Sequence, residues 1–223
     1  MVRYIPGIKI RFDYNTVFAR LGYKKSSTQV SGDFRNEIAA WIDEAAAAVK
    51  LEAAVIKCGI TVDSENSRIR IFPENGPDND GQADNRRTNG SSEIEIESKS
   101  LCKFLAGHSR ILLMGITGGS AVMELIDSCQ KNNMTKAVVL DAAAGEMVDN
   151  GLDFIISLVN RELARESGRL LSKRFSPGYG DLSLIAQREF YHLLEMEKLG
   201  VTLTESFMLV PQKSVIALTG IVY

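Results

Sequence analysis

The sequence has few of the residues that metal sites and disulfide frameworks require. It contains 3 Cys and 2 His among 223 residues. Cys58, Cys102 and Cys129 are odd in number and widely spaced, with no C-x-x-C pair, which is typical of reduced thiols packed in a core. His108 and His192 do not form an H-E-x-x-H pair, and neither lies near a cysteine at zinc-finger spacing. The sequence therefore predicts no intrinsic metal site.

The chain also lacks an excess of charge and a long apolar run. Its 26 Lys+Arg and 28 Asp+Glu give a net charge of −2, so we expect no nucleic-acid partner. The most apolar stretch, Ile111 to Met123, is interrupted by glycines and is shorter than the roughly 20 residues of a membrane span. The first basic residues are followed by Asp13 and Asn15, unlike a secretion signal. We expect a cytoplasmic protein with no membrane span.

The first half of the chain changes its apolar period several times. Ile8, Ile10 and Phe12 alternate with charged residues and predict a strand. Apolar residues at helical spacing then predict a long helix from Phe34 to near Gly59, with Ser31 or Asp33 as its N-cap. Two further alternating runs predict antiparallel strands of opposite charge, one with arginines at 68 and 70 and one with glutamates at 93, 95 and 97. The polar segment 73–92 between them predicts a flexible loop.

The second half alternates strand and helix patterns. A buried strand at 110–116, a helix at 120–129 and a second buried strand at 136–141 would form a parallel βαβ unit. The remaining expected elements are a helix from about Gly145 to Leu171, a loop at 174–180, a helix capped by Asp181 or Ser183 and stopped by Gly200, and strands at 206–210 and 214–222. We therefore predict one α+β domain over residues 1–223, with a mixed, largely antiparallel sheet flanked by long helices.

The segment from Gly115 to Ser120 is a first candidate ligand site. It joins a predicted strand to a predicted helix, where backbone N–H groups could hold a phosphate. It lacks the lysine of a P-loop and the G-x-G-x-x-G spacing. A glycine-rich turn needed only for close packing explains the same residues.

The loop from Arg174 to Asp181 is a second candidate site. Pro177 restricts the backbone, and Gly178 can adopt conformations closed to other residues. Arg174 offers a planar fork suited to a carboxylate, and Tyr179 offers an aromatic face that attracts cations. A ligand that is both zwitterionic and cationic would suit this pair. A simple helix-connecting turn remains the alternative.

This loop and the segments after it resemble the reactivation domain of cobalamin-dependent methionine synthase. The shared motifs are the Arg-x-x-Pro-Gly-Tyr loop at 174–179, a following helix, Leu-Thr-Glu-Ser-Phe at 203–207, and Pro-x-x-Ser-Val at 211–215. They occur in the family's order and spacing. The close resemblance covers roughly residues 136–223, and the N-terminal half resembles stand-alone relatives of that domain only loosely.

The resemblance implies binding of S-adenosylmethionine. In the family the loop arginine, here Arg174, holds the ligand's carboxylate, and the backbone of the neighbouring loop, here Ser176, Gly178 and Tyr179, contacts the nucleoside. The family also uses one acidic residue near the N-terminus and one on the helix before the loop. Asp13 and Asp153 correspond to these two, and the alternatives on the same helix are Glu146 and Asp149.

The resemblance also implies a partner. In the family the domain presents the methyl group to cobalamin carried by another module, and an electron, from flavodoxin in some organisms, completes the reactivation. This chain has no recognisable module for corrinoid, homocysteine or folate, so it would act on a separate corrinoid methyltransferase protein. Two other hypotheses stay open: an accessory subunit that docks without binding the nucleoside, and an unrelated α/β nucleotide-binding enzyme that uses Gly115 to Ser120.

Overall fold

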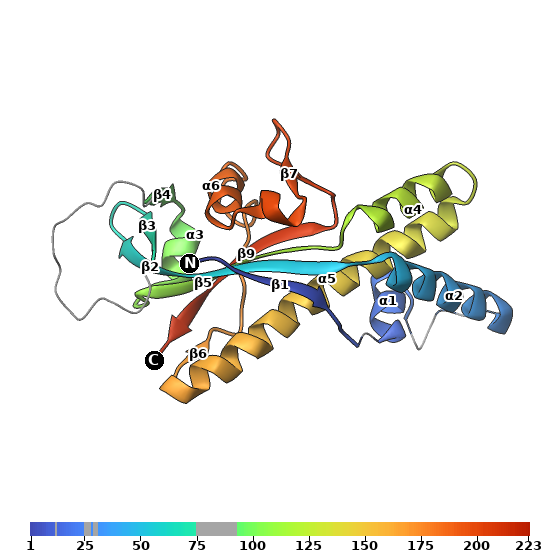
Figure 1. Ribbon diagram of the computed structural model, residues 1–223, viewed down its shortest axis with the longest axis horizontal. Coiled ribbons are helices and arrows are strands. Elements are labelled where there is room, and N and C mark those ends of the chain that lie inside the picture. Colours follow the sequence, from blue (N-terminus) through green and yellow to red (C-terminus); the bar gives the residue numbers. More distant parts are fainter. Residues whose placement is uncertain (12, 25–27, 29–30, 75–92) are drawn as a thin grey trace.

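The described part of the chain forms a long antiparallel sheet, with helices on both faces and a group of helices beyond one end (Figure 1). The computed structural model describes residues 1–11, 13–24, 28, 31–74 and 93–223. The strands are β1 (Arg3–Ile8), β2 (Leu51–Asp63), β3 (Arg68–Pro73), β4 (Ile94–Glu97), β5 (Arg110–Thr117), β6 (Arg169–Leu170), β7 (Thr202–Leu203), β8 (Leu209–Val210) and β9 (Ser214–Val222). The helices are α1 (Tyr14–Arg20), α2 (Gly32–Ala48), α3 (Lys99–Phe104), α4 (Ser120–Gln130), α5 (Met134–Leu163) and α6 (Ala186–Leu193), with short 3₁₀ turns η1 (Ala164–Glu166) and η2 (Met196–Leu199).

The main sheet has the strand order β4-β3-β2-β5-β9-β6, and β1 also pairs with β2. Strand β2 is long enough to pair with two strands along the same edge. Its first half pairs with β1, with Arg3 opposite Val55, and its second half pairs with β3, with Cys58 opposite Pro73. β7 and β8 form a separate two-stranded sheet. Every strand pair in the described part is antiparallel.

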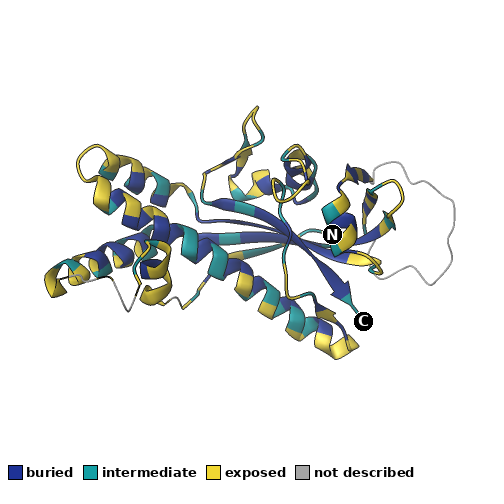
Figure 2. Ribbon diagram, turned by 180° about the vertical axis from the view of Figure 1, so that it is seen from behind, coloured by how far each residue is buried: buried dark blue, intermediate teal, exposed yellow. Residues whose placement is uncertain are grey.

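The central strands are buried on both faces. Along β5, Ile111 and Leu113 belong to the core beneath α3, α6 and η2, whereas Leu112, Met114 and Ile116 belong to the core beneath α5. Successive side chains of a strand point to opposite faces, so a strand covered on both sides reads as one continuous apolar run. Figure 2 shows these strands as buried and the outer faces of the helices as exposed.

A third core lies beyond the sheet, among α1, α2, α4 and the first half of α5. It is built from side chains such as Val17, Ile42 and Leu140, with alanines that allow close helix approach. Ser31 begins α2 as its N-cap, and its Oγ accepts a hydrogen bond from Phe34 N at 3.3 Å. None of the helices in the described ranges is long and apolar enough to cross a membrane.

Several expected element boundaries are wrong. Strand β1 ends at Ile8, where the sequence pattern predicts the first strand to begin. Residues 136–141 are not a strand but part of α5, so the expected βαβ unit does not exist and β5 pairs antiparallel with β2 and β9. The helix expected to end near Leu171 ends at Leu163, and the helix expected to reach Gly59 ends at Ala48, before β2. Short, fully buried apolar runs have no period that separates a strand from a helix, and the buried segments of this chain include such runs.

The predicted pairing of oppositely charged strands is confirmed. Arg68 lies opposite Glu97 and Arg70 opposite Glu95 in the β3–β4 register. Arg68 Nη2 lies 3.0 Å from a Glu97 carboxylate oxygen, and the Arg70 Nε lies 3.2 Å from Glu95. The expected flexible loop at 73–92 falls, beyond Pro73 and Glu74, outside the described residues.

Candidate ligand-binding site

The candidate loop is attached to the outer edge of the sheet, alongside the middle of β9. Phe175 and Leu218 exchange two backbone hydrogen bonds, of 2.9 Å and 2.8 Å, which form an isolated antiparallel bridge. The Thr219 hydroxyl also donates to the Lys173 carbonyl at 2.9 Å. This attachment fixes the backbone on both sides of Arg174.

After Phe175 the loop makes a tight, internally bonded turn. Tyr179 N donates to the Ser176 carbonyl at 3.1 Å, and Gly178 N donates to the Leu182 carbonyl at 2.9 Å. Gly178 has φ +84°, a left-handed conformation that favours glycine. The turn therefore presents the Tyr179 side chain, which is 68% exposed, to solvent.

Asp181 joins the loop to α3. Its carboxylate accepts hydrogen bonds from Ser98 Oγ at 2.6 Å, Lys99 N at 2.8 Å and Ser100 N at 3.1 Å. The Ser98 hydroxyl and these N–H groups lower the pKa of Asp181 to about 2. The sequence predicts Asp181 or Ser183 as the N-cap of the helix after the loop. Both are wrong: α6 begins at Ala186 with Ile185 as its N-cap, and Asp181 instead satisfies free N–H groups of α3.

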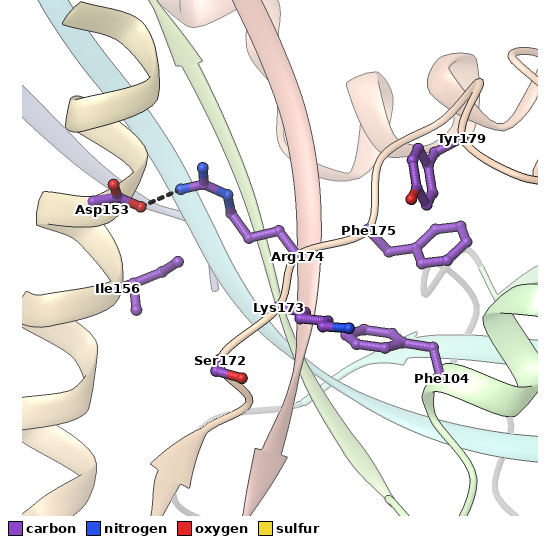
Figure 3. A pocket seen from close by; sticks show the side chains of 8 residues that line it. All are labelled: Phe104, Asp153, Ile156, Ser172, Lys173, Arg174, Phe175 and Tyr179. Carbon is purple, nitrogen blue, oxygen red and sulfur yellow. Dashed lines mark hydrogen bonds and ion pairs between the residues drawn. The ribbon is translucent and has the colours of Figure 1, made fainter. Parts of the chain in front are cut away.

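A cleft of about 480 Å³ lies between this loop, α3 and α5, and we call it the ligand cleft (Figure 3). Its lining residues are Phe104, Asp153, Ile156, Ser172, Lys173, Arg174, Phe175 and Tyr179. Arg174 points from the loop toward α5, where its Nη1 donates to Asp153 Oδ1 at 2.5 Å. The Arg174 side chain is 26% exposed and that of Asp153 is 67% exposed. The site thus holds a cation and an anion side by side, both reachable from solvent.

Three aromatic rings line the other side of the cleft. Phe175 is buried and lies between Phe104 and Tyr179, with ring centroids 5.6 Å and 5.3 Å away. The contact between Phe175 and Tyr179 is edge-on, with an interplanar angle of 86°. The cluster holds Tyr179 in place from one side only, so its outer face is free to contact a ligand.

This arrangement suits the head of an α-amino acid. Among the hydrogen bonds of the described residues, Arg174 uses only Nη1, so the donors on Nε and Nη2 are left for a carboxylate. Asp153 can accept hydrogen bonds from an ammonium group, and Tyr179 offers its π face to a positive centre.

The structure brings together three of the six predicted ligand-binding residues, namely Arg174, Tyr179 and Asp153, as lining of the ligand cleft. Ser176 and Gly178 shape the turn but do not line the cleft. Asp13 is not brought there: it is the N-cap of α1, and its carboxylate accepts from Asn15 N at 2.9 Å.

The two alternatives to Asp153 have other roles. Glu146 lies 3.1 Å from Arg20 Nε, and Asp149 lies 2.5 Å from Arg20 Nη2, so both hold α1 against α5. Asp153 is therefore the acidic residue of α5 that faces the loop arginine.

Sequence reasoning missed several lining residues. Phe104, on α3, and Ile156, on α5, are far from the loop in sequence, and only the fold places them beside it. Lys173 and Phe175 flank Arg174 directly. Phe175 in particular could have been found, because an aromatic residue inside a Gly- and Pro-rich loop needs a packing partner.

In the other candidate segment, Gly115 to Ser120, the space beside Gly115 is filled by a packed side chain, and the N–H groups of Gly118 and Gly119 already donate hydrogen bonds within the protein. A Cβ on Gly115 would lie 2.3 Å from Met196 Sδ. Gly118 N donates to the Lys213 carbonyl at 2.7 Å, and Gly119 N donates to Thr117 Oγ1 at 3.1 Å. These N–H groups are thus not free to hold a phosphate, and the close-packing interpretation accounts for the glycines. Within the described ranges, no group of three or more His, Cys, Asp or Glu side chains is placed to hold a metal ion.

Comparison with known proteins gives a match in structure and none in sequence. No family model matches the chain, and no curated protein matches it. Among solved structures, the chain is similar to the MetH reactivation domain bound to AdoHcy, with a TM-score of 0.64 and 16% sequence identity over 99% of this chain and 78% of that one. The chain therefore has the α+β fold of the MetH reactivation domain, as the loop motifs predicted, although the identity is too low to carry over more than the fold.

Proposed function

We propose that the ligand cleft binds S-adenosylmethionine and that the protein supports reductive reactivation of cobalamin on a partner methyltransferase, of methionine synthase type. The observation that carries this proposal is the Arg174–Asp153 pair, 2.5 Å apart at the edge of the cleft. Support comes from the fold, since the MetH reactivation domain it resembles was solved with AdoHcy bound.

The pair can open for a ligand at little cost. An ion pair as exposed as Arg174–Asp153 is worth only about 0–1 kcal/mol. A ligand carboxylate would take a bidentate position on Arg174, and the ligand ammonium would replace the guanidinium at Asp153. Until then, the ion pair keeps the arginine oriented into the cleft.

Tyr179 would contact the sulfonium. Its ring is fixed edge-on by Phe175 and is otherwise exposed. A cation over an aromatic face is stabilised by about 0.5–2 kcal/mol. S-adenosylhomocysteine has a neutral thioether in place of the sulfonium, so this contact would favour the substrate over the product.

The chemistry itself would belong to the partner's cobalamin. There the cobalamin, reduced by one electron from a separate reductant, would accept the methyl group as the C–S bond of the sulfonium breaks and S-adenosylhomocysteine leaves. The contribution of this chain is to hold the methyl group in line for attack. Arg174, Asp153 and Tyr179 would do so by fixing both ends of the amino-acid portion.

Calorimetric titration of the protein with S-adenosylmethionine tests the proposal. We expect saturable binding that Arg174→Ala weakens by about 1.5–3 kcal/mol, which is roughly 10- to 150-fold. Arg188→Ala is the matched control, because Arg188 pairs with Glu189 on α6 and does not line the cleft. Absence of binding to the unmodified protein, or equal losses in the two variants, would contradict the proposal and favour the accessory subunit that docks without the nucleoside.

A further inference from the structure

The outer strand β4 leaves one edge of the main sheet open. Within the described part of the chain it pairs with β3 alone, at the opposite end of the sheet from α2 and α4 (Figure 1). The main-chain groups of an antiparallel strand point alternately toward its partner and away from it. Ser98 N donates to the Ser67 carbonyl at 2.9 Å in the β3–β4 register, so the even-numbered residues of β4 bond to β3. The odd-numbered residues Glu95 and Glu97 therefore point their N–H groups outward, and we call this row the open edge.

The open edge lacks the usual protection of an outer strand. Natural edge strands are commonly interrupted by proline, by a bulge or by lysine side chains. The segment Ile94–Glu97 contains neither proline nor lysine, and its register with β3 runs without a shift over all four residues. Ile94 and Ile96 are buried in the core that also contains Leu101 of α3, which holds the strand in place. A further strand would thus meet an edge that is already formed.

The charges on the solvent face of these strands alternate in sign from one strand to the next. Asp63 on β2 lies opposite Arg68 on β3, and Arg68 lies opposite Glu97 on β4. In the neighbouring row, Arg70 lies opposite Glu95. Opposite charges stabilise cross-strand pairs, and like charges directly opposite each other destabilise them. Since both rows end in a carboxylate at the open edge, a further strand continues the alternation if it carries cations.

The same rule disfavours a second copy of this chain at the open edge. Two β4 strands that pair antiparallel with their isoleucines on one face would set glutamates opposite glutamates. These carboxylates are not removed by burial, because the side chains of Glu95 and Glu97 are 43% and 68% exposed. The edge is therefore selective: it repels its own copy and acidic strands and favours basic ones.

From these observations we propose that the open edge binds an extended segment of a partner protein that carries two basic residues two positions apart. The segment would add to the sheet as a further strand. Main-chain hydrogen bonds to Glu95 and Glu97 would supply affinity, and the pairing of its cations with the two carboxylates would supply selectivity. The inference goes beyond the proposed function and does not depend on it, since no residue of β4 lines the ligand cleft.

Calorimetric titration with the capped peptide Gly-Arg-Val-Arg-Val-Gly, in low-salt buffer, tests the inference. We expect saturable one-to-one binding that weakens as salt is added, and no binding of the matched peptide Gly-Glu-Val-Glu-Val-Gly. The basic peptide should slow hydrogen exchange at the amides of Glu95 and Glu97. The amides of Ile94 and Ile96 already face β3 and should change little.

Two variants separate the contributions of charge and main chain. Glu95→Gln/Glu97→Gln should weaken peptide binding about three- to tenfold, because two exposed ion pairs are lost. The control Glu124→Gln/Glu205→Gln removes the same charge from exposed positions on other elements and should have no effect.

Glu95→Pro removes one outward N–H, which an edge strand tolerates, and should bind about two- to tenfold more weakly than Glu95→Gln. Unchanged hydrogen exchange at Ile94 and Ile96 would show that this variant keeps β4 paired with β3. The inference is overturned if the basic peptide does not saturate the protein, if the acidic peptide binds as tightly, or if the control double variant loses as much affinity as Glu95→Gln/Glu97→Gln. Equal binding by Glu95→Pro and Glu95→Gln would also overturn it, because the main-chain contact would then be absent.

Discussion

Replacing Phe175 by leucine should reveal how much the aromatic cluster contributes to the ligand cleft. Leucine keeps most of the apolar area that is buried at this position but removes two ring contacts, to Phe104 at 5.6 Å and to Tyr179 at 5.3 Å. Each aromatic pair adds about 0.5–1.5 kcal/mol beyond buried area. The two together predict a loss of about 1–3 kcal/mol in the free energy of unfolding.

Urea denaturation of the variant measures this loss directly. Phe154→Leu is a matched control, because Phe154 is half-buried on α5 and has no aromatic partner among the described residues. A double-mutant cycle with Phe104→Leu should give a coupling energy of about 0.5–1.5 kcal/mol between positions 104 and 175.

The same variant should also bind S-adenosylmethionine less tightly, because Tyr179 loses the ring that holds it edge-on. A loss of stability no larger than that of Phe154→Leu, or a coupling energy near zero, would refute the claim that the rings act as a cluster.

Three further predictions concern the elements around the cleft. Asp181→Asn should increase hydrogen exchange in both the loop and the start of α3, and Asp63→Asn, which removes a local cap in the β2–β3 turn, is the control. The pKa of Asp181 is lowered from 3.8 to about 2. The stability that its ionised form adds is therefore complete above pH 4 and is lost as the pH falls toward 2. Gly115→Ala should destabilise the protein by about 1–3 kcal/mol in urea denaturation, because the new Cβ would collide with Met196; a neutral effect would reopen the site at Gly115 to Ser120. Burial, together with the charge of Glu74, raises the pKa of Cys58 to about 12, so its thiol should resist alkylation in the native protein, and rapid labelling detected by mass spectrometry would contradict that burial.

The sequence could predict the local features that depend on neighbouring residues. The Ser31 cap, the alternating arginine and glutamate strands, and the Gly- and Pro-containing loop at 174–180 all follow from short-range rules, and the structure has each of them. The loop motifs also predicted the fold, since they resemble the family whose solved member matches this chain in structure. Arg174 and Tyr179 could be selected as candidates because their chemistry is visible without knowing their neighbours.

What lies beside these residues depends on contacts between distant parts of the chain. Only the tertiary structure shows that Asp153, rather than Glu146 or Asp149, faces Arg174, because all three lie on one helix and differ only in which element packs against each. The same is true of Phe104, which reaches the cleft because Asp181 fastens the loop to α3. Residues 136–141 were misassigned for a related reason: a buried apolar run is compatible with a strand or a helix, and packing in the third core decides for the helix.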